Sequence, residues 1–92
     1  MQNIMDDKPY LPKPDIGKLV EEAIGQVKYL LINEQFMVSD LFIGYQWKRL
    51  SNYERAQVGH RFYHEYAISA EGKTKIEILD KTARNQQRYK RR

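Results

Sequence analysis

The sequence contains no cysteine. Disulfide bonds, thiolate metal sites and cysteine nucleophiles are therefore excluded, and this composition fits a reducing compartment. Long apolar runs are also missing, because no stretch approaches the roughly 18 residues of a membrane span. The first residues carry neither the basic flank nor the apolar stretch of a secretory signal. We therefore expect a soluble cytoplasmic protein without a membrane partner.

Patterns that support catalysis are scarce. The five glycines are scattered along the chain, so there is no glycine-rich phosphate loop. Ser39 and Ser51 precede helical patterns and are better explained as helix caps than as nucleophiles. His60 and His64 have the i, i+4 spacing of two metal ligands, but Arg61 stands where a metalloprotease motif has glutamate. We therefore expect no enzyme, no bound metal and no cofactor.

Acidic residues are rare in the last fifth of the chain. Residues 73–92 carry eight lysines and arginines against two carboxylates, a net charge of +6, whereas residues 1–72 carry eight against ten, a net charge of −2. A local positive excess of this size attracts a phosphate backbone. The remaining composition, 41% hydrophobic and 12% aromatic, is that of one small globular domain.

Periodicity predicts where this domain begins. All three prolines fall in residues 1–14, which we expect to form an extended N-terminal arm. From Asp15, a suitable N-cap, apolar residues recur every three or four positions up to Leu31, which predicts an amphipathic helix. Residues 15–92 are thus expected to form a single domain. The apolar positions of this helix are Ile16, Leu19, Val20, Ala23, Ile24, Val27, Leu30 and Leu31.

Two short elements are expected after this helix, which Asn33 would end. Alternation at residues 36–38 predicts a very short strand. Ser39 is a good N-cap, so a short helix is predicted over residues 40–49. The residues that this helix would bury are Leu41, Phe42 and Tyr45, with Trp47 and Leu50 closing its end.

A third helix and a hairpin complete the chain. The motif SNYE, residues 51–54, has the form of a capping box and predicts a helix over residues 52–68. Residues 69–73 are expected to form a turn, after which alternation predicts two strands of a C-terminal hairpin. The residues of these elements expected to face the core are Phe62, Tyr66, Ala67, Ile76, Ile78 and Tyr89, and Phe36, Phe42 and Trp47 are expected to be core residues as well.

The order of elements is helix, short strand, short helix, longer helix and hairpin, which is the order of a winged helix-turn-helix. We therefore predict an α+β, winged-helix-like fold of three helices with a C-terminal β-hairpin wing. In such a fold the third helix enters the major groove, and the wing contacts adjacent backbone or minor groove. The alternative is a three-helix α+β domain with a hairpin and a frayed tail.

Two groups of side chains are candidates for nucleic-acid contact. Cations of the hairpin would neutralise phosphates, and Asn85 and Gln86 could bond sugar, phosphate or bases. The third helix presents residue types that read base edges, and its first turn suits a phosphate. For the hairpin the alternatives are a solvated tail and contact with an acidic protein surface, and for the helix the alternative is an ordinary exposed face. The hairpin candidates are Lys81, Arg84, Gln87, Arg88 and Lys90, and the helix candidates are Asn52, Tyr53, Arg55, Gln57, His60, Arg61 and His64.

The stretch FMVSDLFIGYQWKRLSNYERAQVGHRFYHEY, residues 36–66, resembles a small bacterial and phage family of unknown function. The final KTARNQQRYKR is similar to the Asn-rich, Tyr-containing end of that family. The resemblance covers residues 36–91. It implies that the protein originates from low-GC Gram-positive bacteria, their prophages or mobile elements. It implies no activity and no site residues. The positions that carry it are Phe36, Val38, Asp40, Leu41, Phe42, Trp47, Arg55, Gly59 and Phe62.

Three functions fit these observations. We predict a small non-enzymatic protein that binds duplex DNA, as an accessory protein or transcription regulator of a phage or mobile element. An inhibitor of a host nucleoprotein, similar to an anti-CRISPR protein and acting through protein–protein contact, is the alternative. A third possibility is a homodimer through the helix Ile16–Leu31, whose apolar stripe would serve both core and partner.

Overall fold

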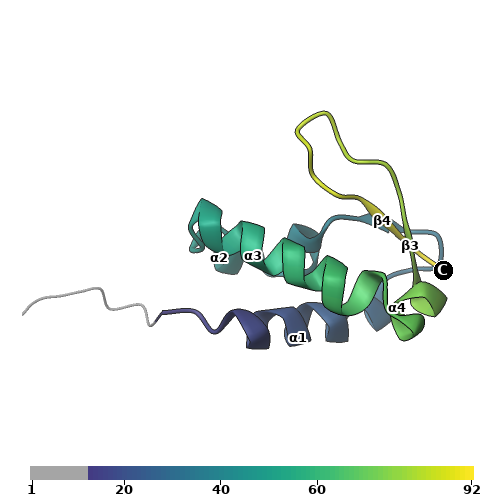
Figure 1. The fold of residues 1–92 in the computed structure, drawn as a ribbon, viewed down its shortest axis with the longest axis horizontal. Helices are drawn as coiled ribbons and strands as arrows, with labels where there is room; N and C mark the ends of the chain where they lie inside the picture. Colours follow the sequence, from purple (N-terminus) through teal and green to yellow (C-terminus); the bar gives the residue numbers. More distant parts are fainter. Residues whose placement is uncertain (1–12) are drawn as a thin grey trace, which may run out of the picture.

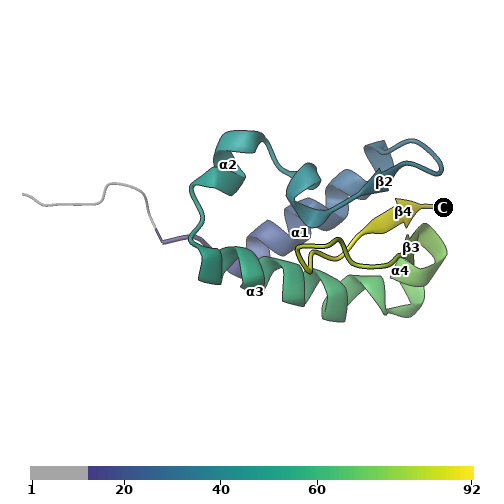
Figure 2. The same ribbon diagram turned by 90° about the horizontal axis from the view of Figure 1, so that it is seen from above.

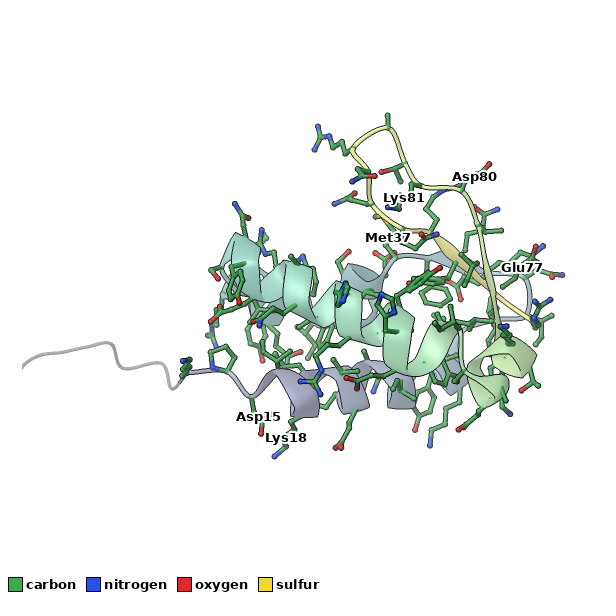
Figure 3. The ribbon with its side chains drawn as sticks, in the orientation of Figure 1. Asp15, Lys18, Met37, Glu77, Asp80 and Lys81 are labelled. Atoms are coloured by element: carbon green, nitrogen blue, oxygen red, sulfur yellow. The ribbon has the colours of Figure 1, made fainter. Side chains whose placement is uncertain are left out.

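The first helix begins where the sequence predicts it. A computed structural model describes residues 13–92, so almost all of the expected arm over residues 1–14 lies outside the described residues. Helix α1, Ile16–Gln26, follows Asp15, whose carboxylate accepts a hydrogen bond from the backbone N–H of Lys18 at 3.2 Å (Figure 3). This contact satisfies one of the free N–H groups of the first turn and confirms Asp15 as the N-cap.

The same helix ends earlier than expected. A single 3₁₀ turn, Val27–Tyr29, follows α1 and the backbone is extended at Leu30, so the prediction of a helix up to Leu31 was wrong. The carboxylate of Glu34 accepts the backbone N–H of Leu31 at 2.8 Å. Asn33 has a positive φ of 71°, a conformation that asparagine tolerates better than most residues. These local contacts turn the chain towards the sheet in place of another helical turn.

The segment after this turn forms two short helical pieces. Strand β2, Gln35–Phe36, confirms the predicted strand. A 3₁₀ turn, Val38–Leu41, and helix α2, Gly44–Lys48, then replace the single helix predicted over residues 40–49. The carboxylate of Asp40 accepts the backbone N–H of Met37 at 2.8 Å, and the Gln46 side chain accepts that of Ile43 at 3.2 Å. Each piece therefore has its own N-terminal side-chain contact, and Ser39 is not the cap that the sequence suggested.

The capping box at the start of the third helix is confirmed. Helix α3, Asn52–Phe62, follows Ser51. The Ser51 hydroxyl accepts the backbone N–H of Glu54 at 3.1 Å, and the Glu54 carboxylate accepts that of Ser51 at 2.8 Å. The helix continues as a π-helical turn, Tyr63–Ala67, which was not predicted but brings its end within one residue of the expected position.

We expect Ser51→Ala to lower the free energy of unfolding by about 1 kcal/mol, because it removes one half of this capping box. Urea unfolding followed by the fluorescence of the single tryptophan, Trp47, measures the change. Ser39→Ala is the matched control, since among residues 13–92 the Ser39 side chain caps no helix. Equal losses in the two variants would contradict the assignment.

Residues 69–73 form the start of a fourth helix, and the predicted turn was wrong. Helix α4, Ala70–Lys75, begins at Ser69. The Ser69 hydroxyl accepts the backbone N–H of Gly72 at 2.9 Å and donates to the carbonyl of Tyr66 at 2.6 Å. A serine with these two contacts favours a helix start over an open turn.

Three antiparallel strands form a small sheet in the order β2-β4-β3. Strand β3 is Ile76–Ile78 and strand β4 is Tyr89–Arg91. Tyr89 is the register partner of both Phe36 and Ile78, so it lies in the middle strand at one end of the sheet. Figures 1 and 2 show the loop between β3 and β4 rising from the sheet and bending back over α3.

The core lies between α1, α3 and the sheet, which makes the fold α+β as predicted (Figure 1). Phe36 and Phe62 are buried as expected, whereas Phe42 and Trp47 are half-buried and stack on each other at 5.5 Å. Tyr45 is 54% exposed, so the expectation that it is buried was wrong. The buried residues are Val20, Ala23, Val27, Phe36, Val38, Leu41, Leu50, Val58, Phe62, Tyr66, Ala67, Ile76 and Tyr89.

Within residues 13–92, no helix combines the length and the apolar character needed to cross a membrane.

Candidate nucleic-acid interface

A groove separates α3 from the β3–β4 loop. It has a volume of about 810 Å³ and receives side chains from α3, from the loop and from the segment that follows β2. In the described part of the chain no aspartate or glutamate lines it. Six of the twelve residues that the sequence nominated for nucleic-acid contact do line it, namely Asn52, Arg55, His60, His64, Lys81 and Gln87.

The helix wall of the groove is polar at its start and aromatic further on. Asn52 is the first residue of α3 and is exposed. Arg55 is half-buried, because its Nε donates to the Trp47 carbonyl at 3.1 Å and a terminal nitrogen donates to the Lys48 carbonyl at 3.3 Å. Arg55 therefore ties α3 to the end of α2, and only part of its guanidinium is available to a ligand.

Two histidines continue this wall. The ring centroids of His60 and His64 lie 4.3 Å apart, and both side chains are exposed. Tyr63 packs edge-on against His64 with its ring centroid 5.1 Å away. No group of three or more potential metal ligands occurs within residues 13–92. Both imidazoles line the groove and lie side by side there.

The loop wall is built by the loop's own hydrogen bonds. The Thr82 hydroxyl accepts the backbone N–H of Gln86 at 3.1 Å, and the Thr82 N–H donates to the carbonyl of Gln86 at 2.8 Å. Asn85 has a positive φ of 66° at the tip. Figure 3 shows Lys81 on the inner side of the loop and Asp80 pointing outward. The loop thus turns a cation and its amides towards α3 and its carboxylate away from it.

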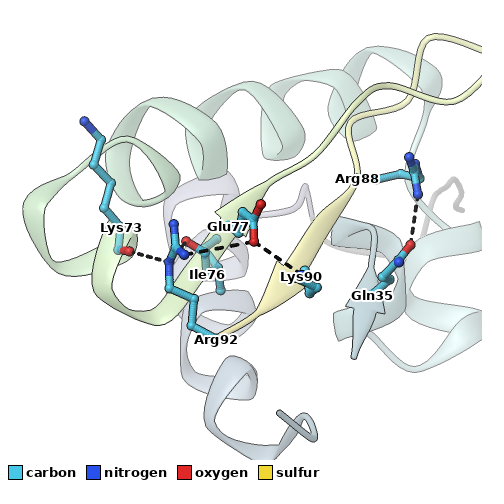
Figure 4. A network of polar contacts seen from close by, with 7 residues as sticks. All are labelled: Gln35, Lys73, Ile76, Glu77, Arg88, Lys90 and Arg92. Carbon is cyan, nitrogen blue, oxygen red and sulfur yellow. Dashed lines mark hydrogen bonds and ion pairs between the residues drawn. The ribbon is translucent and has the colours of Figure 1, made fainter. Parts of the chain in front are cut away.

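Most cations near the C-terminus hold the sheet together and do not line the groove (Figure 4). Arg88 donates to the Asp80 carbonyl at 3.0 Å and to the Gln35 side chain at 2.9 Å. Lys90 pairs with Glu77 at 3.4 Å, and Arg92 donates to the Lys73 carbonyl at 2.7 Å. Arg88 and Lys90 were nominated for phosphate contact, but the fold places both beside internal partners.

The polar stripe of α3 divides between two sides of the helix. Arg61 forms an ion pair with Glu65 at 2.7 Å, and this hydrogen-bonded carboxylate raises the pKa of Arg61. A Cβ at Gly17 would lie 3.4 Å from the Arg61 guanidinium, which places Arg61 beside α1. Gln57 donates to the Tyr53 hydroxyl at 3.4 Å, and neither residue lines the groove. Of the stripe, only the two histidines reach it.

Residues 21–91 match the family described as a domain of unknown function, DUF1413. The chain belongs to this family. The resemblance to an uncharacterised family is thereby confirmed, although the match begins inside α1 and not at residue 36 as the sequence suggested. No curated protein and no solved structure gave a match.

The DUF1413 domain carries groove residues that the sequence did not nominate. Trp47 was expected in the core and Tyr63 was not among the candidates, yet both line the groove and are half-buried. Their role depends on where the β3–β4 loop folds, so no local signal marks them. Asn85 and Gln86 were expected among the hairpin contacts, and both line the loop wall.

Tyr89 is the unusual member of the groove lining in this DUF1413 domain. Its side chain is fully buried, and within the described residues its hydroxyl has no hydrogen-bond partner. Burial raises the pKa of Tyr89 far above its usual range, with a smaller contribution from Tyr63. Buried polar groups nearly always have a partner. An unpaired hydroxyl in the wall of a groove is therefore a feature that a bound ligand would explain.

Proposed function

We propose that this domain binds nucleic acid, with duplex DNA as the partner, through α3 and the β3–β4 loop. The observation that carries the proposal is a groove between a helix and a loop that, among the described residues, no carboxylate lines, and whose lining combines two cations and two imidazoles with four amide side chains. A nucleic-acid surface excludes carboxylates because they repel phosphates, and it uses amides and imidazoles for sugar, phosphate and base contacts.

A winged-helix-like arrangement is part of this proposal. The β3–β4 loop would be the wing and α3 the recognition helix, with α4 as an addition between them. The element order and the position of the loop over α3 support it (Figures 1 and 2). In that arrangement both walls of the groove face the same stretch of duplex.

Lys81 and Arg84 are the cations best placed to contact phosphates. Both are exposed. Lys81 lies on the inner side of the loop (Figure 3), and Arg84 lies in the turn next to Asn85 at its tip. Asn52 would bond the backbone near the start of α3, where free N–H groups favour an anion. His60 and His64 would present the groove face. We further propose that the protein serves a phage or mobile element in the bacterial cytoplasm, as an accessory protein or transcription regulator.

The salt dependence of binding tests the proposal. We expect Lys81→Ala/Arg84→Ala to weaken binding to a labelled random duplex and to flatten the slope of log K against log salt by about 0.9 per lost contact. Fluorescence anisotropy across a salt series measures both quantities. The matched control is Lys18→Ala/Lys28→Ala, which removes the same charge from exposed positions at α1 and its following turn.

A surface effect of total charge would flatten the two slopes equally, and that result would contradict the placement of DNA at the groove. Absence of binding by the folded wild-type protein at low salt would overturn the nucleic-acid proposal itself.

Inhibition of a host nucleoprotein through protein contact is the second candidate function. Tyr29, Leu31 and Ile32 are 70%, 73% and 62% exposed in the turn after α1, an apolar cluster of the kind that protein partners cover. The same exposed turn is the surface that a homodimer would use, because the core already covers much of the apolar stripe of α1. Sedimentation of wild type and Leu31→Ser/Ile32→Ser tests self-association, which only the wild type should show.

A further inference from the structure

The groove between α3 and the β3–β4 loop is lined more by rings and amides than by cations. Its only lysine or arginine side chains, among the described residues, are Lys81 and Arg55, and Arg55 already donates to two carbonyls. A site for phosphates alone would need more free cations. The ring and amide side chains in the lining are Trp47, His60, Tyr63 and His64, and Asn52, Asn85, Gln86 and Gln87.

The rings are accessible to a flat ligand. His60 and His64 are exposed, and Trp47 and Tyr63 are half-buried, so each retains surface towards the groove. Unpaired bases stack on such rings irrespective of sequence, because every base has a π-face. In a continuous duplex the bases already stack on each other and leave these rings unused.

The amides and the Tyr89 hydroxyl provide hydrogen bonds for a base edge. Gln86 is exposed on the loop wall, while Gln87 uses its amide nitrogen on the carbonyls of Leu79 and Arg88 and keeps its oxygen for other donors. The Tyr89 hydroxyl has no partner among residues 13–92. Base edges carry both donors and acceptors, so they match a lining of amides and one hydroxyl.

We propose that this groove holds an unpaired nucleotide base, so that the domain prefers nucleic acid with an unpaired segment over continuous duplex. The inference rests on the proposed nucleic-acid function and specifies the ligand of the same site. The groove volume of about 810 Å³ lies within the roughly 300–1,000 Å³ of pockets that enclose small ligands. The loop cation Arg84 then contacts the backbone beside the unpaired base.

The test compares two labelled DNA probes of equal length, a continuous duplex and the same duplex with a central gap that leaves three unpaired nucleotides. Anisotropy titrations give an affinity ratio. We expect the gapped probe to bind at least about tenfold tighter than the continuous duplex. This ratio lies in the lower half of the range expected when one base stacks on an aromatic side chain.

Tyr89→Phe tests the assignment of the groove. The substitution keeps the ring and removes a hydroxyl without a partner among the described residues, so the fold is retained, and thermal unfolding checks this. We expect it to lower the preference for the gapped probe by about three- to tenfold, the effect of one hydrogen bond. Tyr66→Phe, another buried tyrosine outside the groove, is the control and should keep the wild-type ratio.

The outcomes are distinguishable. Equal affinity of the wild-type protein for the two probes overturns this inference and leaves the proposed DNA function standing. A preference that is unchanged in Tyr89→Phe overturns the assignment of the base to this groove. Absence of binding to both probes overturns the proposed function together with the inference.

Discussion

Replacing Gly72 by alanine is expected to destabilise the protein by about 3 kcal/mol or more, the upper end of the range for overpacking. A Cβ at this position would overlap the carbonyl oxygen of Tyr66 and would lie 2.6 Å from its carbonyl carbon. The obstacle is backbone, which cannot rotate away as a flexible side chain would. Because small domains have unfolding free energies of about 5 kcal/mol, much of the total stability would be lost.

Gly25→Ala is the matched control for this substitution. Gly25 lies in the last turn of α1, and a Cβ there would meet nothing within 4 Å. Alanine has a higher helix propensity than glycine, so the substitution should raise the free energy of unfolding by up to about 1 kcal/mol. Urea unfolding of the two variants should therefore shift in opposite directions. Similar shifts would contradict the close approach of α4 to the π-helical turn before it.

Phe62→Ala is expected to lower the free energy of unfolding by about 3–5 kcal/mol, the usual range when a buried aromatic residue is truncated to alanine. The Phe62 side chain is fully buried, and its ring centroid lies 5.5 Å from that of Tyr66 and 5.3 Å from that of Tyr89. The truncation therefore removes contacts between α3, the π-helical turn and the middle strand of the sheet. Calorimetry or urea unfolding measures the loss.

Tyr45→Ala is the informative comparison, because the sequence predicted both aromatic residues as core. Tyr45 is 54% exposed, and its ring contacts the Arg49 guanidinium at 4.7 Å. A contact of this kind at an exposed site contributes about 0.5–1 kcal/mol, so we expect a loss of less than about 1 kcal/mol. A loss as large as that of Phe62→Ala would show that α2 packs more tightly than the structure indicates.

The helix caps were predicted correctly and the length of α1 was not, because a local sequence pattern contains only interactions between near neighbours. The N-cap at Asp15 and the capping box at Ser51 depend on residues three positions apart, and both were predicted and confirmed. The extent of α1 was overestimated because an apolar stripe is compatible with a longer helix. The side-chain contacts of Glu34 and Asp40 decided where the following segments turn, and such contacts compete with helix formation without changing the apolar pattern.

The candidate site was predictable only in part. Residue types and net charge nominated α3 and the hairpin, because cations, amides and imidazoles are recognisable from sequence alone. The sequence could not predict which cations would be held by internal partners and which would remain available to a ligand. Arg88 reaches Gln35 across 53 positions of the chain, and Arg91 reaches the carbonyl of Val27 across 64. Sequence spacing carries no information on pairs so far apart.

The sequence by itself determined the α+β class, the order of the elements apart from α4, the caps of α1 and α3, most of the buried residues and the basic character of the C-terminal segment. These depend on interactions between near neighbours and on the burial of apolar side chains. Only the tertiary structure decided that the β3–β4 loop bends back over α3, and so brought Trp47, Tyr63 and the unpaired hydroxyl of Tyr89 into one groove. The physical reason is that a groove is formed by segments distant in the chain, and its lining is set by how they pack.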